Sequence, residues 1–212
     1  NILTVAWTGT ICTNPPMAYI SVRPERYSYD MIKKSGEFVI NLTTEQLIKA
    51  TDFCGVRSGR DVDKWLKCNL TKEKADTVKC PLIAESPVNI ECKVTEIKEL
   101  GSHHMFIADV TAVHVDESYM DKNNSFHLND SNLLAYSHGS YFGLGNELGT
   151  FGYSIRKKKA AAKSSQKAEK KSHTDKKRIV KEKKSMSQKV MAKQNIKHSK
   201  TTVKNKRIKK HK

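Results

Sequence analysis

The sequence lacks several features that identify common classes of protein. No apolar run approaches the roughly 18–20 residues of a membrane span, and no signal peptide opens the chain. We therefore expect no membrane partner and a cytoplasmic location. The five cysteines are an odd number without CxxC spacing, which indicates neither a disulfide framework nor a zinc site. They are typical of small buried thiols in a reducing compartment.

Aromatic residues are missing from the end of the chain, and charge is distributed unevenly. Residues 156–212 contain 24 Lys and Arg, 3 Asp and Glu and no Phe, Tyr or Trp, a net charge of +21. The net charge of residues 1–155 is −4. So little apolar surface cannot offset the entropy of ordering the basic segment. The composition predicts a globular domain over 1–155 and a disordered, Lys-rich tail over 156–212.

The basic tail is expected to attract polyanions. Its cations predict binding to nucleic acid that is independent of sequence and weakens steeply with salt. Without aromatic side chains, it is not expected to stack on single-stranded bases. The alternative is a solvated appendage without a physiological partner.

Short strands and turns dominate the first 155 residues. Strands are predicted over residues 1–13, 18–23, 37–42, 88–95 and 105–115, the last of them central because it is apolar on both faces. In 88–95, apolar residues alternate with polar ones such as Asn89 and Glu91, which predicts a half-buried strand. Regular βαβ alternation is lacking, so the pattern favours a mainly β fold, a small antiparallel barrel with short helices.

Three short helices are expected between these strands. Ser28 is predicted to cap a helix that runs to residue 34 and ends before Gly36. Thr43 and Gln46 have the spacing of a capping box for a helix to about residue 53. A third short helix is predicted over residues 62–66.

Two motifs are weaker than they look. The glycines of 143–149 have the spacing GxGxxxG, which is not the GxGxxG of dinucleotide-binding folds, and no βαβ unit surrounds them. His103 and His104 are adjacent on a strand and therefore point to opposite faces. Because no acidic or cysteine partner lies at ligand spacing, no metal site is predicted.

Two stretches could bind an anion. The loop over residues 57–64 combines glycine, the hydroxyl of Ser58 and three cations, a combination that suits a phosphate group. Ser28 lies at a predicted helix N-terminus behind Arg23 and Arg26, where free N–H groups and the helix dipole favour negative charge. The alternatives are a solvated basic loop and a plain helix cap. Two such sites without a Walker motif suggest a phosphorylated cofactor.

Gly9 interrupts a predicted strand between Thr8 and Thr10. Glycine weakens a strand unless another group must approach the backbone closely. A flat aromatic ligand would supply that reason, and a β-bulge is an equally good explanation.

Several motifs, spread in order over residues 1–155, resemble those of the flavin reductase-like family, and of its flavoredoxin-type branch in particular. They are Asn1-x-x-Thr4-Val5-Ala6-Trp7-Thr8-Gly9, Pro15-Pro16, Ser21-Val22-Arg23-Pro24-Glu25-Arg26-Tyr27-Ser28, Glu37-Phe38-Val39-Ile40-Asn41-Leu42, Ser58-Gly59-Arg60-Asp61-x-x-Lys64, Ser86-Pro87-Val88-Asn89-Ile90-Glu91-Cys92 and a hairpin over 101–115. The resemblance implies a Greek-key, FMN-binding split barrel of six strands that forms a homodimer and holds FMN non-covalently. The family's first strand would precede Asn1, so we expect an N-terminal piece to be missing.

The resemblance also implies a set of cofactor-binding residues. Family side chains at the flavin site correspond to Asn1, Trp7, Ser28, Lys64 and His103. The backbone of Thr8, Gly9, Thr10, Asn41 and Leu42 would line the isoalloxazine ring, and Ser28, Ser58 and Lys64 would lie near the phosphate. Either Tyr136 or Phe142 would cover the ring. No catalytic side chain is implied.

The function implied by the resemblance is that of an FMN-dependent oxidoreductase. A flavin reductase takes hydride from NAD(P)H and passes electrons to free flavin, ferric iron or a partner protein. The rival within the family is an electron carrier that serves a redox partner protein and never binds NAD(P)H. A third hypothesis is a nucleic-acid-associated protein that acts through its basic tail, with the barrel as a scaffold.

Overall fold

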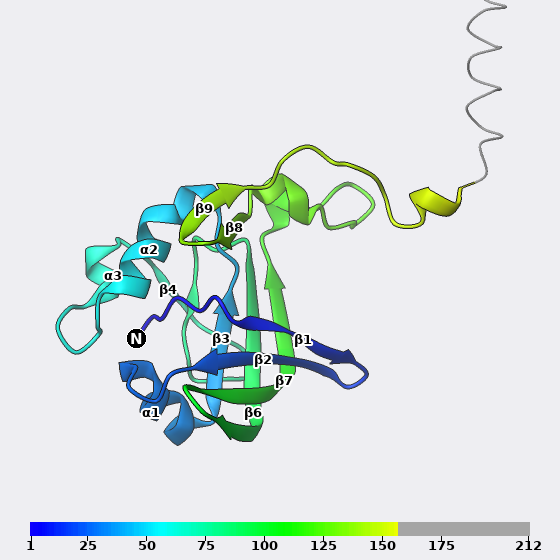
Figure 1. Ribbon diagram of the computed structural model, residues 1–212. Helices are drawn as coiled ribbons and strands as arrows, with labels where there is room; N and C mark the ends of the chain where they lie inside the picture. Colours follow the sequence, from blue (N-terminus) through cyan, green and yellow to red (C-terminus); the bar gives the residue numbers. More distant parts are fainter. Residues whose placement is uncertain (157–212) are drawn as a thin grey trace, which may run out of the picture. The chain divides into compact units, whose positions relative to one another are not determined.

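The computed structural model describes residues 1–156 (Figure 1). Residues 157–212, and with them the predicted disorder of the basic tail, lie outside the described residues. Asn1–Asn146 form one compact unit, and of the second unit a single 3-10 turn, Tyr153–Ile155, is described. Within the described part of the chain, no helix is long and apolar enough to cross a membrane.

The first unit consists of strands and short helices, in chain order β1 (Thr8–Thr13), β2 (Pro16–Val22), α1 (Tyr27–Ser35), β3 (Glu37–Asn41), α2 (Ile48–Val56), α3 (Lys64–Lys67), β4 (Lys72–Glu73), β5 (Leu82–Ile83), β6 (Val88–Leu100), β7 (His103–Val115), β8 (Leu134–Ser137) and β9 (Ser140–Gly143). Five strands form one antiparallel sheet in the order β1-β2-β7-β6-β3, and β4-β5 and β8-β9 form two-stranded sheets. The central position of β7 confirms the sequence prediction, as does the mainly β, antiparallel fold with short helices.

The core lies between the main sheet and α1. Phe106 of β7 is fully buried, and Tyr29 of α1 packs edge-on against its ring at 5.4 Å between centroids. The other buried members of this cluster are small or aliphatic, apart from one phenylalanine: Ile20, Val22, Phe38, Cys92 and Ala108. Burial of this apolar surface fixes α1 against the sheet, and thereby fixes the position of the start of that helix.

The predicted first strand is too long. Only Thr8–Thr13 pair with β2, whereas residues 1–6 form no ladder. Hydrogen bonds that involve side chains hold this N-terminal segment in place instead. Lys64 Nζ donates to the carbonyl of Ile2 at 2.7 Å, and Thr4 Oγ1, within the segment, donates to the carbonyl of Thr51 at 2.5 Å. The segment passes between α1 on one side and α2 and α3 on the other (Figure 1).

Two helix starts also differ from their predictions. The N-cap of α1 is Arg26, so that Ser28 is the second helical residue, and no side chain caps this end. Gly36 ends the helix as predicted, in the left-handed region with φ of 69°. The capping box at Thr43 and Gln46 does not form, because the N-cap is Thr44, one residue later, and no side chain caps this end. A 3-10 turn over Glu45–Leu47 leads into α2 instead.

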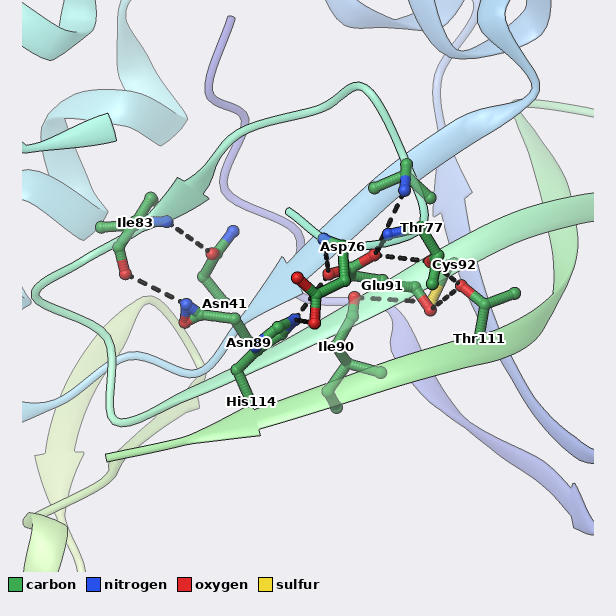
Figure 2. Close-up of polar contacts among 11 residues, drawn as sticks. Asn41, Asp76, Thr77, Ile83, Asn89, Ile90, Glu91, Cys92, Thr111 and His114 are labelled. Atoms are coloured by element: carbon green, nitrogen blue, oxygen red, sulfur yellow. Dashed lines mark hydrogen bonds and ion pairs between the residues drawn. The ribbon is translucent and has the colours of Figure 1, made fainter. Parts of the chain in front are cut away.

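The alternation predicted for β6 holds only beyond Cys92. Asn89 and Glu91, which were expected on the solvated face, are 4% and 0% exposed. The segment between β4 and β5 covers this face, and its backbone N–H groups at Asp76 and Thr77 donate to the Glu91 carboxylate at 2.8 and 2.6 Å (Figure 2). Glu91 can be buried because another segment of the chain supplies the hydrogen bonds that its carboxylate needs.

Candidate functional site

The N-terminal segment brings three of the predicted site residues together. Asn1 Nδ2 donates to Ser28 Oγ at 2.7 Å, and Lys64 holds the next residue through its bond to the Ile2 carbonyl. Asp63 caps α3 by accepting from two backbone N–H groups, and so fixes the start of the helix that carries Lys64. These contacts therefore form one cluster of Asn1, Ser28 and Lys64, although Asn1 and Lys64 are 63 positions apart in the sequence.

Lys64 is a buried cation whose hydrogen-bond donors are only partly used. Its side chain is almost fully buried, and Nζ donates to the carbonyls of Ile2 and Cys54, each at 2.7 Å. Burial lowers the pKa of Lys64, and the nearby charge of Arg26 lowers it further. An ammonium has three N–H donors, of which these bonds use two. A nearby anion would relieve the cost of this charge.

The loop after α2 packs against the same cluster. A Cβ at Gly59 would collide with the amide end of the Asn1 side chain, so glycine lets the loop approach Asn1 closely where it lies now. Gly59, Arg60 and Lys64 line a hollow of about 400 Å³. Ser58 is absent from that lining, and its Oγ accepts from the Arg60 N–H at 3.2 Å within the loop.

A second hollow, of about 170 Å³, is lined by residues 3–7 of the N-terminal segment and by parts of the chain that follow. Trp7, Arg23, Arg26 and His103 are among the residues that line it. The rings of Trp7 and His103 are stacked, 4.1 Å apart with an interplanar angle of 33°. His104 points to the opposite face and its Nδ1 is 2.7 Å from Tyr29 Oη, as the sequence predicted for adjacent residues of a strand.

Positive charge predominates at this site. Five cations line the two hollows, which are Arg23, Arg26, Arg60, Lys64 and Lys72, and Asp61 and Asp63 also line the larger one. In residues 1–156, no carboxylate lies within ion-pair distance of any of these five cations. The first turn of α1 adds backbone N–H groups that no side chain caps. Unpaired cations beside an open helix N-terminus attract anions, phosphate in particular.

The predicted isoalloxazine-lining residues lie in two places. Thr8, Asn41 and Leu42 line a cavity of about 600 Å³ together with the N-terminal segment. The amide of Asn41 is already used, since Nδ2 donates to the Val39 carbonyl. Its Oδ1 accepts from the Ile83 N–H, as Figure 2 shows. Gly9 and Thr10 lie on β1 outside this lining.

The structure supplies a reason for Gly9. A Cβ at this position would lie 3.0 Å from the Tyr19 ring, so glycine permits close packing of a side chain of the neighbouring strand. The register of β1 also shifts between Thr10 and Cys12, which is the irregularity expected of a bulge. Neither observation requires a ligand at Gly9.

The two aromatic candidates for covering a flavin ring lie on one hairpin. Tyr136 is on β8 and Phe142 on β9, and both are exposed. The Tyr136 ring lies 5.2 Å from that of Tyr141, whose hydroxyl donates to Asp52 at 3.2 Å. The hairpin therefore packs beside α2, and both alternatives stay open.

Sequence reasoning missed some residues that shape the site. Thr4 positions the N-terminal segment by donating to a backbone carbonyl, and Cys54 positions Lys64 through its own carbonyl, which accepts from Nζ. Neither contact has a sequence signature, because both depend on which segments meet in the fold. Asp63 could have been found, since an aspartate two residues before the apolar pair Trp65-Leu66 is an ordinary helix-capping signal.

The chain is similar to known proteins in both sequence and structure. The family described as "Flavin reductase like domain" matches residues 1–145. A flavoredoxin of Desulfovibrio vulgaris (Miyazaki F) superimposes with a TM-score of 0.68 and 28% identity, over 74% of this chain and 85% of that one. A flavoredoxin from Methanosarcina acetivorans has the same TM-score and 25% identity, over 74% and 83% of the two chains.

Curated relatives are matched over shorter stretches. An uncharacterised protein of Archaeoglobus fulgidus is 31% identical over 121 residues, which are 57% of this chain and 68% of that protein. In two other archaeal relatives, the match spans 44% and 64% of the relative's own length. On the family match, which covers more than half of the sequence, and on the shared fold, this chain belongs to the flavin reductase-like family.

Proposed function

We propose that the chain is an oxidoreductase that works through non-covalently bound FMN. The observation that carries the proposal is the arrangement of unpaired cations around the start of α1, next to the stacked rings of Trp7 and His103. FMN has a dianionic phosphate at one end and a flat ring system at the other. The described residues offer complementary chemistry for both.

The residues of the two hollows, together with Ser28 from the lining of the cavity of about 600 Å³, divide into two roles. Lys64, Ser28 and the N–H groups at the start of α1 would hold the phosphate, with Arg23, Arg26 and Arg60 adding positive charge. Trp7 and His103 would contact the flat part of the ligand. Bound FMN supplies reversible two-electron redox chemistry, and the protein supplies binding, orientation and polar contacts that tune it.

The electron donor is proposed by family likeness alone. NAD(P)H or a redox partner protein would serve, because a nicotinamide can stack on an exposed flavin face without a dinucleotide-binding motif. We further propose a homodimer, which is supported by large apolar side chains exposed on the main sheet or next to it, Trp7 at 57%, Ile11 at 44% and Val113 at 55%.

Spectroscopy of the purified protein tests this function. The full chain is expected to be yellow, and acid or heat should release FMN at about one molecule per chain, identified by mass spectrometry. Anaerobic addition of NADH or NADPH should bleach the visible band if a nicotinamide is the direct donor. A chain that remains colourless after incubation with excess FMN and removal of the free cofactor would contradict the proposal.

A second candidate function follows from the charge of the basic tail. The net charge of +21 over residues 156–212 supports electrostatic, sequence-independent binding to nucleic acid. A mobility shift of duplex DNA that disappears as salt rises, and that is lost on deletion of 157–212, would support it. Retention of FMN in the same truncated protein would assign the two functions to different parts of the chain.

A further inference from the structure

Two cysteines meet beside the candidate site. The Sγ atoms of Cys54, on α2, and Cys68, which directly follows α3, are 3.9 Å apart, and both thiols are free. Thiols at this distance need to approach by only about 2 Å to reach the S–S bond length of a disulfide. Since each sulfur lies at the end of a short helix, a small shift of either helix end would suffice.

Both cysteines are also tied to Lys64. The Cys54 carbonyl accepts from Lys64 Nζ, and the Cys68 N–H donates to the Lys64 carbonyl at 3.0 Å. The residues between the cysteines include Gly59 and Arg60, which line the hollow of about 400 Å³. A bond between the two sulfurs would close this whole anion-binding loop into a ring.

We propose that Cys54 and Cys68 form a reversible disulfide under peroxide and that this disulfide staples the loop between α2 and α3. The two thiols are the electron donors and the peroxide is the acceptor. In the first step, the Cys68 thiolate attacks the O–O bond, which gives a sulfenic acid and one water molecule. In the second step, the Cys54 sulfur attacks that of Cys68, the S–S bond forms and a second water leaves.

Burial assigns these roles to the two thiols. Cys54 is 2% exposed, and burial raises the pKa of its thiol to about 12, with the nearby Cys68 adding to the shift. Cys68 is only partly buried, so peroxide can reach it first. The Lys64 ammonium, which opposes the rise in the Cys54 pKa, would help that thiol to lose its proton in the second step.

Peptide mapping of the full chain tests the proposal. Reduced protein is treated with hydrogen peroxide, alkylated, and mapped by mass spectrometry without a reductant. We expect one intramolecular link between Cys54 and Cys68, a mass loss of about 2 Da per link before alkylation, and full reversal by dithiothreitol. The midpoint of thermal unfolding should rise on the order of 5 °C, because the link constrains the unfolded chain.

Variants and other outcomes decide the remaining questions. Cys68→Ser should abolish the link, whereas the matched control Cys80→Ser, which removes another partly buried thiol, should retain it. The proposal is overturned if both cysteines of the wild-type chain are alkylated after peroxide, or if Cys68 is converted to sulfinic acid without a link. If the disulfide forms but the midpoint of thermal unfolding does not change, the claim that the disulfide constrains the loop between α2 and α3 is refuted.

Discussion

Lys64, at the candidate site, and Glu91, on β6, are both buried charges, but the structure compensates them in different ways. Both Glu91 oxygens are saturated, because Oε1 and Oε2 accept from a histidine, a hydroxyl and three backbone N–H groups: His114 Nε2, Thr77 Oγ1 and the N–H groups of Asp76, Thr77 and Val78. Lys64 has two carbonyl partners and no carboxylate within ion-pair distance in residues 1–156.

The direction of each pKa shift follows from this contrast. Burial alone would raise the pKa of Glu91, but hydrogen bonds from Thr77, Asp76 and His114 outweigh burial and lower it to about 2. For Lys64, burial dominates and lowers the pKa, so the charged form remains costly. A saturated charge stabilises the fold by itself, whereas an undersatisfied charge is suited to a ligand that completes its surroundings.

The same contrast argues against a metal ion at Glu91. Asp76, Glu91 and His114 place their ligand atoms within 4.8 Å of one another. The Glu91 oxygens, however, already accept the hydrogen bonds that hold the segment between β4 and β5 (Figure 2). A cation would have to displace those donors, so we interpret the cluster as a structural clasp.

The largest expected effect on stability is that of Glu91→Gln. The substitution removes the negative charge that accepts five hydrogen bonds. It also places an amide N–H₂ group, itself a donor, against some of those five donors. The free energy of unfolding is expected to fall by about 3 kcal/mol, measured by urea denaturation. Glu96→Gln, at an exposed position of the same strand, should change it by less than about 0.5 kcal/mol. Equal effects of the two variants would contradict the role of Glu91.

The pH dependence of stability should show the same clasp. Because the pKa of Glu91 falls from 4.5 to about 2 on folding, its stabilisation is complete above pH 4.5 and is lost as the pH falls toward 2. The loss attributable to Glu91 is about 3 kcal/mol. Denaturation curves between pH 6 and the lowest pH at which the chain folds should therefore be less steep in pH for Glu91→Gln than for wild type.

For the site, Lys64→Met should weaken FMN binding by roughly 10- to 100-fold, since it removes one charge-assisted hydrogen bond to a dianion. Lys67→Met, on the same helix but exposed, is the matched control and should bind FMN as wild type does. Affinity is measured by titration of FMN fluorescence, after circular dichroism has confirmed that both variants are folded. Identical affinities would place the phosphate elsewhere.

A smaller effect is expected for Ser28→Ala. The hydroxyl of Ser28 is a neutral group at the start of α1, so its loss should weaken FMN binding by roughly fivefold, about 1 kcal/mol. The same titration checks this value, with Ser118→Ala as an exposed control. A loss that exceeds the effect of Lys64→Met would mean that the helix start, rather than the ammonium, dominates anion binding.

The sequence predicted the fold better than it predicted the polar details. The central position of β7 and the opposite orientations of His103 and His104 follow from local sequence pattern, which the sequence displays. The burial of Glu91 was not predictable in this way, because its donors come from a segment that covers β6 only in the folded chain. The capping role predicted for Ser28 failed because the helix begins two residues earlier than predicted, with Arg26 as its N-cap.

The site shows the same division. The family motifs place Asn1, Ser28 and Lys64 at one site, and the structure brings these three residues together. The motifs could not indicate that Lys64 is buried and already bonded to two carbonyls, since those carbonyls belong to distant segments. Ser58 and Gly9 have local roles in the structure, in its own loop and against Tyr19. Whether they also contact FMN stays a prediction.

A comparison of FMN with riboflavin tests the central claim most directly, because the two ligands differ only in the phosphate that the unpaired cations are proposed to bind. The full chain should bind FMN at least about tenfold more tightly than riboflavin at low salt. In Lys64→Met, this ratio should fall, mainly through weaker FMN binding with riboflavin binding unchanged. Equal affinities of the wild-type chain for the two ligands would contradict the assignment of the cations around α1 as a phosphate site.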